Sequence, residues 1–130
     1  MRKKKTATPT DAELDILRAL WTHGSGTVKQ VLQWLPQKPV RGYTTILKLL
    51  QIMSEKGLVK RDERNRAHVY SANFSLEYTR KNLVAQLMDK AFDSSVSSLV
   101  MGALSAKPAS REELAEIRKL LDELEGDPDD

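Results

Sequence analysis

The sequence predicts a mainly α-helical protein with one small β-hairpin. Short apolar stripes with helical spacing occupy most of the 130 residues, and one stretch after Gly57 instead has the composition of paired strands. Charge is also divided along the chain. Residues 1–74 hold 14 Lys and Arg against 6 Asp and Glu, a net charge of +8, whereas residues 75–130 hold 7 against 12, a net charge of −5. A basic half is typical of a surface that binds a polyanion, although such asymmetry also serves solubility alone.

Two short helices are predicted before residue 40. Thr10 and Glu13 form a T-x-x-E capping box, in which each side chain binds the other's free backbone N–H, so the first helix begins at Thr10. Thr27 and Gln30 form a second box at the start of the next helix. Pro36 ends this helix, because proline lacks the N–H of an interior helical hydrogen bond.

Residues 41–57 predict a third helix with two contrasting sides. Its first turn carries hydrogen-bonding side chains, and Gly57 is a natural stop because glycine adopts the left-handed conformation cheaply. Its length of roughly 20 Å fits the major groove of B-DNA, and the alternative is an ordinary surface helix. The apolar stripe consists of Ile46, Leu49, Leu50 and Met53, and the polar stripe of Thr44, Lys48, Gln51 and Glu55.

Residues 58–72 indicate a β-hairpin, because β-branched and aromatic residues flank a polar centre. The hairpin carries four cations, which are Lys60, Arg61, Arg64 and Arg66. Three helices followed by a basic hairpin are the order of a winged helix-turn-helix unit, in which the third helix enters the DNA major groove. We therefore predict a winged helix-turn-helix DNA-binding domain at residues 10–74.

The interface with double-stranded DNA is predicted on the third helix and on the hairpin. Thr methyl groups suit contacts with thymine methyls, and Lys48 suits guanine or a phosphate. Arg41 would hold the DNA backbone at the helix entrance, and the arginines of the hairpin would grip it from the wing. The expected DNA-binding residues are Arg41, Tyr43, Thr44, Thr45, Lys48, Arg64 and Arg66.

The residues after Ser75 predict three more helices, which form a helical dimerisation domain at residues 75–125. Ser110 and Glu113 make a third capping box. Helices this short do not close a core in a single copy, so a second copy of the chain is the simplest partner. The alternative is that they fold back on the winged helix. The expected dimerisation residues are Leu83, Leu87, Val96, Leu99, Val100, Leu104, Ile117, Leu120, Leu121 and Leu124.

Other classes of protein find little support in the sequence. His23 and His68 lie far apart without metal-ligand spacing, and no catalytic motif appears, so no metal, no cofactor and no enzyme activity are expected. The chain has no cysteine, no secretory signal and no apolar run of ~20 residues, which favours a cytoplasmic protein without membrane insertion. A disordered basic arm is expected at residues 1–9, and an acidic tail at 126–130.

Four motifs occur in order along the chain: TDAELDILRALW, YTTI, EKGLVKR and NRAHVYSA. Together they resemble the penicillinase-repressor family (the BlaI/MecI/CopY group), from about Thr10 to Leu124. The resemblance implies a homodimeric, bacterial winged-helix transcriptional repressor that binds an inverted-repeat operator of the TACA/TGTA type. In this family, a membrane-embedded metalloprotease sensor often triggers cleavage of the repressor.

Three departures limit what the resemblance implies. Lys48 stands where family members commonly have Thr, and Ile52 where they have Arg, so the operator sequence does not carry over. The cysteine cluster of the copper-responsive branch is absent. Gly102 and Ala103 stand where the best-known members are cut between Asn and Phe. The rival to DNA binding is a winged-helix adaptor for other proteins, which would not need the basic surface.

Overall fold

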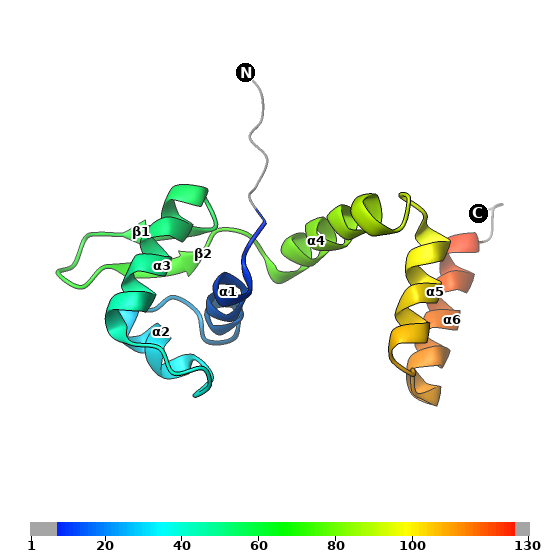
Figure 1. Ribbon diagram of the computed structural model, residues 1–130, viewed down its shortest axis with the longest axis horizontal. Helices are drawn as coiled ribbons and strands as arrows, with labels where there is room; N and C mark the ends of the chain where they lie inside the picture. Colours follow the sequence, from blue (N-terminus) through cyan, green and yellow to red (C-terminus); the bar gives the residue numbers. More distant parts are fainter. Residues whose placement is uncertain (1–7, 127–130) are drawn as a thin grey trace, which may run out of the picture. The chain divides into compact units, whose positions relative to one another are not determined.

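The computed structural model describes residues 8–126, and within them six helices and one hairpin follow one another in the predicted order (Figure 1). The mainly α-helical class with a small β wing is therefore confirmed. The predicted basic arm and acidic tail lie largely outside the described residues. The elements are α1 (Asp11–His23), α2 (Val28–Trp34), α3 (Tyr43–Lys56), β1 (Val59–Asp62), β2 (Val69–Ala72), α4 (Leu76–Ala91), α5 (Val96–Ala106) and α6 (Arg111–Glu125).

The helix ends lie where local side chains stabilise them. At the start of α1, the Glu13 N–H donates to Thr10 Oγ1 over 3.2 Å, and the Thr10 N–H donates to Glu13 Oε1 over 2.9 Å. The same reciprocal pair begins α2 and α6, so all three predicted capping boxes are confirmed. At the end of α3, Gly57 has a φ of 83°, the left-handed conformation expected of a glycine stop.

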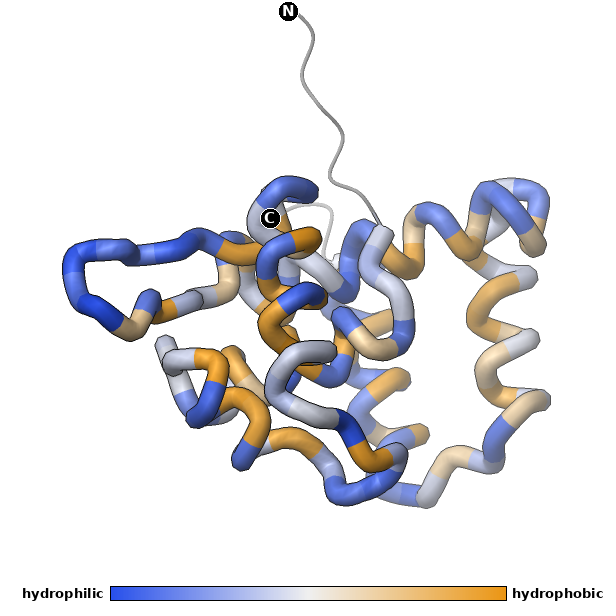
Figure 2. The backbone as a smooth tube through the Cα atoms, turned by 60° about the vertical axis from the view of Figure 1, so that its left-hand side comes forward, coloured by the Kyte–Doolittle hydropathy of each residue, from blue (hydrophilic) through white to orange (hydrophobic). Residues whose placement is uncertain are grey.

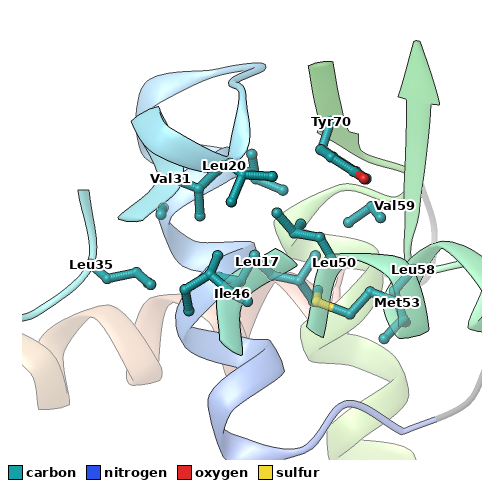
Figure 3. Close-up of a cluster of buried hydrophobic side chains, with 13 residues drawn as sticks. Leu17, Leu20, Val31, Leu35, Ile46, Leu50, Met53, Leu58, Val59 and Tyr70 are labelled. Carbon is teal, nitrogen blue, oxygen red and sulfur yellow. The ribbon is translucent and has the colours of Figure 1, made fainter. Parts of the chain in front are cut away.

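The apolar stripe of α3 lies at the centre of the N-terminal core. Ile46, Leu50 and Met53 are completely buried, whereas Leu49 packs at the edge. Burial of one such side chain contributes about 1.5–3 kcal/mol, so this stripe fixes which side of α3 faces inward. Around it, α1, α2 and the hairpin supply Leu17, Leu20, Val31, Leu35, Leu58, Val59 and Tyr70 (Figure 3).

The hairpin, which we call the wing, pairs at Gly26 with the connection between α1 and α2. Strands β1 and β2 pair antiparallel, with Val59 opposite Ala72. Gly26, in the connection between α1 and α2, exchanges two backbone hydrogen bonds with Tyr70, at 2.9 and 2.8 Å. Because Tyr70 is itself buried, these bonds hold the base of the wing against the helices.

The chain divides into two compact units, residues 1–83 and 84–130, and the boundary between them falls within α4. The predicted dimerisation domain begins earlier, at residue 75. The first half of α4 belongs with the N-terminal unit because the Trp21 Nε1–H donates to the Phe74 carbonyl over 3.0 Å. Its first turns also line a groove with α1. The sequence predicts α4 as one helix, but it does not reveal that the two halves of this helix belong to different units.

The C-terminal unit contains the second half of α4 together with α5 and α6. None of the described residues of these three helices is buried. Phe92 packs closely on α5, since a Cβ added to Gly102 would lie 2.9 Å from its ring. Ser95 caps the start of α5, because its side chain accepts a hydrogen bond from the Ser98 N–H. In a single copy, this unit therefore leaves its apolar stripes largely open to solvent.

Gly26→Ala should destabilise the N-terminal unit. A Cβ at this position would lie 2.6 Å from the ring of Trp34, which stacks on His23 with a centroid distance of 4.6 Å. Overpacking of this kind costs about 1–3 kcal/mol, which urea unfolding followed by tryptophan fluorescence measures. Gly42→Ala is the control, because a Cβ there meets nothing within 4 Å. Equal losses in the two variants would contradict the packing.

Candidate nucleic-acid interface

The outward side of α3 is a continuous polar surface. Thr44, Lys48, Gln51 and Glu55 are all exposed, as their spacing predicts. Thr45 is exposed beside them, and Tyr43 keeps 51% of its surface accessible at the first turn. The structure thus brings together the four α3 residues that were predicted to contact DNA, which are Tyr43, Thr44, Thr45 and Lys48.

Two further residues extend this surface and were absent from the predicted site. Gln51 follows Thr44 by seven positions, so the polar stripe already contained the signal that would have found it. Ile52 keeps 37% of its surface exposed on the outer side, although its apolar character suggested burial. An exposed amide offers both a donor and an acceptor, and an exposed isoleucine offers methyl groups.

Arg41 lies just before α3 and is held by α1. Its Nη2 donates to Asp15 Oδ2 over 2.9 Å, and only 13% of its side chain is exposed. Its Nη1 is buried and has no hydrogen-bond partner within the described residues. The sequence predicted a contact between Arg41 and a phosphate, and that contact stays a prediction. In the free chain, this arginine ties the loop that enters α3 to α1.

A second ion pair holds the other end of α3. Lys56 Nζ donates to Glu13 Oε1 over 2.7 Å, and only 3% of the Glu13 side chain is exposed. The same carboxylate completes the cap of α1 at Thr10. Sequence reasoning identified Glu13 only as a capping residue, because its partner lies more than forty positions away. The two ion pairs together attach both ends of α3 to α1.

The wing carries its arginines in two different states. Arg64 pairs with Asp62 through three hydrogen bonds, of 3.0 and 3.2 Å from Nε and 2.7 Å from Nη2. Arg61 pairs with Glu63 over 2.6 Å. Arg66 is exposed and has no ion-pair or hydrogen-bond partner in the described part of the chain. The tip of the wing forms one hydrophilic stretch in Figure 2.

The Arg64 pair sets the protonation of Asp62. The hydrogen bond from the Arg64 side chain, followed by the one from its backbone N–H, lowers the pKa of Asp62 from 3.8 to about 2. The same pairing raises the pKa of Arg64. At neutral pH the carboxylate is therefore charged, and it competes with any phosphate for this guanidinium. Of the two wing arginines predicted to contact DNA, only Arg66 has no carboxylate partner, among the described residues, that would compete with a phosphate for its guanidinium.

The residues predicted for dimerisation fall in both compact units. Leu83 lines the groove with α1 in the N-terminal unit. The others lie in the C-terminal unit, where Leu99 and Ile117 are half-buried and the rest are exposed. The exposed ones are Leu87, Val96, Val100, Leu104, Leu120, Leu121 and Leu124. These side chains leave a large apolar surface open to solvent, and their role in dimerisation stays a prediction.

The structure also bears on metal binding and on membrane spanning. Among residues 8–126, His, Cys, Asp and Glu side chains do not gather in groups of three that would suit a metal ion. His23 instead stacks on Trp34. Across the same described range, no helix has the length and apolar character that a bilayer crossing requires.

Three helices, a paired wing and an exposed polar side of the third helix define a winged helix-turn-helix protein. The model of the penicillinase repressor family matches residues 9–123. The chain belongs to the penicillinase repressor family, which confirms the resemblance carried by its four motifs.

Individual relatives show the extent of the similarity. The penicillinase repressor of Bacillus licheniformis is 24% identical over 120 residues, which cover 92% of this chain and 94% of that protein. The solution structure of the DNA-binding domain of the repressor BlaI is 27% identical, with a TM-score of 0.49, and covers 57% of this chain and 90% of that one. The solution structure of the monomeric form of Bacillus licheniformis BlaI in complex with the blaP half-operator is 27% identical, with a TM-score of 0.48. It covers 58% of this chain and 92% of that one.

The Arg64–Asp62 pair should persist into acid. Because the folded pKa of Asp62 is lowered, the pair is fully formed above about pH 4 and is lost as the pH falls through about 2. An NMR titration of the Asp62 carboxyl carbon measures this midpoint. Arg64→Gln should raise the midpoint toward 3.8, whereas Arg66→Gln, the control, should leave it in place. A midpoint near 3.8 in the unchanged chain would show that the pair does not form in solution.

Proposed function

We propose that this chain is a homodimeric transcriptional repressor that binds an inverted-repeat operator in double-stranded DNA. One observation carries the proposal: the polar side of α3 faces solvent because Ile46, Leu50 and Met53 on its apolar side are completely buried. Membership of the penicillinase repressor family supports a regulatory, non-enzymatic protein that binds DNA. The proposed operator is of the TACA/TGTA type. We expect its exact sequence to differ from that of other family members, because Lys48 and Ile52 replace their common Thr and Arg.

The proposed reading of DNA assigns base contacts to α3 and phosphate contacts to the wing. Thr44 and Thr45 suit thymine methyl groups, and Lys48 suits the acceptors of guanine. Gln51 shares their stripe and suits adenine, which accepts and donates at its major-groove edge. Arg66 is the wing arginine with no internal partner among the described residues, so it reaches a phosphate without breaking an ion pair.

A dimer follows from the open apolar stripes of the C-terminal unit. Leu120 and Leu121 are each 53% exposed, and Leu124 is 73% exposed. A second copy covers the same residues by two-fold symmetry, and it also supplies a second α3 for the other half of an inverted repeat. The burial of both sets of stripes stabilises the dimer through the hydrophobic effect.

Relief of repression by a membrane-embedded sensor protease would require access to a helix. Gly102 and Ala103, at the position of the family's cut, lie inside α5, and Gly102 is covered by Phe92. A protease needs an extended segment, so α5 would have to unwind before cleavage. The dipeptide itself lacks the Asn and Phe of the best-known members.

Substitutions in α3 and in the wing should separate specificity from affinity. Thr45→Ala and Lys48→Ala should relax discrimination at particular base pairs, at a cost of roughly 1–3 kcal/mol for each lost base contact. Arg66→Ala should weaken all sequences alike and reduce the slope of log affinity against log salt by about one. Arg64→Ala should have a smaller effect, because Asp62 already neutralises Arg64.

Binding to operator and to random DNA, measured over a range of salt concentrations, tests this assignment. Lys119→Ala is the matched control, since it removes one positive charge from α6 in the C-terminal unit. If the α3 variants weaken operator and random DNA by equal factors, α3 does not read the major groove, and an adaptor for other proteins becomes the better account.

Leu120→Asp and Leu121→Asp should split the dimer. Each change places a charge in an apolar interface, where an unpaired charge carries a large desolvation cost. Sedimentation of the full chain at micromolar concentration should give a dimer, and each variant should sediment as a monomer. Lys119→Asp, on the same helix, is the control for charge alone. A monomer in the unchanged chain would contradict the proposed assembly.

A further inference from the structure

A groove in the N-terminal unit is used by neither α3 nor the wing. It runs between α1 and the first half of α4 and has a volume of about 310 Å³. Its apolar lining comes from Leu14 and Trp21 on α1 and from Leu76 and Leu83 on α4. Two threonines and two arginines complete the lining, and it includes no acidic residue.

Both helices that line this groove place one arginine between two apolar residues. On α1, Leu14, Arg18 and Trp21 recur at i, i+4 and i+7, and Leu14 and Trp21 lie at the edge of the core with part of their surface open to the groove. On α4, the same spacing places Arg80 between two leucines. The hydrogen bond from Trp21 Nε1–H to the Phe74 carbonyl fixes the start of α4 beside α1. The groove is therefore a built feature of one unit and not a gap between units.

The two arginines of the groove lack an anion. Arg18 and Arg80 are exposed, and neither has an ion-pair partner within residues 8–126. Arg41, Arg61 and Arg64 each pair with a carboxylate, whereas these two share the unpaired state of Arg66 on the wing. Arg18 comes from the α1 wall of the groove and Arg80 from the α4 wall, so an anion inside the groove is attracted by a cation on each side.

We infer that this groove binds a small amphipathic anion, with its apolar body on the leucines and Trp21 and its headgroup between Arg18 and Arg80. Arginine binds carboxylate and phosphate through paired hydrogen bonds, so either headgroup fits. A volume of about 310 Å³ is at the lower end for ligand clefts, which points to a molecule of medium-chain fatty acid size. The site depends on α1 and α4 alone and stands whether or not the chain binds DNA.

The two tryptophans allow a direct test with the full chain and no DNA. Trp21 lines the groove, whereas Trp34 lies on α2 and stacks on His23. Titration with octanoate or octyl phosphate should produce a saturable shift of the Trp21 indole N–H signal in NMR spectra and leave the Trp34 signal in place. The two probes distinguish a carboxylate from a phosphate headgroup. 1-Octanol has the same chain without the charge and should bind at least about fivefold more weakly.

Charge variants identify the headgroup contacts. Arg18→Gln and Arg80→Gln should each weaken octanoate binding by up to about fivefold. Lys81→Gln is the matched control, because Lys81 neighbours Arg80 on α4 without lining the groove. Equal binding of octanol, no Trp21 shift with either anion, or equal weakening by Lys81→Gln would overturn the inference. So would a change of oligomeric state in Arg18→Gln, since the groove would then be an interface between copies.

Discussion

Burial of the apolar stripe of α3 is the constraint on which the rest of this structure depends. Ile46, Leu50 and Met53 have no exposed surface, and every other element of the N-terminal core packs around them. In a helix, residues four apart lie on the same side, so fixing one stripe inward fixes the opposite stripe outward. The polar surface of α3 is therefore a consequence of the core and does not need contacts of its own to hold it in place.

Two ion pairs also restrain the rotation of α3 about its axis and its position along that axis. Asp15 holds Arg41 before the first turn of α3, and Glu13 holds Lys56 in its last turn. Glu13 is the buried partner of its pair, so removing Lys56 would leave a buried charge without compensation. Both acids lie on α1, so this helix supports the orientation of the polar surface of α3 as well as the core. The wing follows a different principle, since its own acids restrain Arg61 and Arg64 and leave Arg66 free of internal partners among the described residues.

Much of the fold could be predicted because its signals are local. The capping boxes lie within four residues of sequence, and the stripe of α3 within eight, so spacing alone located them. Interactions between distant residues escaped prediction. The Glu13–Lys56 pair and the Trp21–Phe74 hydrogen bond, which spans 53 positions, depend on how helices pack. For the same reason, the sequence did not reveal that Leu83 lines the groove with α1, and its assignment to dimerisation stays a prediction.

The central claim is that two copies of α3, joined by the C-terminal helices, read one two-fold DNA site. The most direct measurement is operator affinity as the distance between half-sites is lengthened. An insertion of about 5 bp rotates one half-site to the opposite face of the duplex, and an insertion of about 10 bp returns it. The account predicts that affinity falls sharply at half a turn and partly recovers at a full turn. Affinity that is insensitive to the insertion would contradict dimeric reading of DNA by α3.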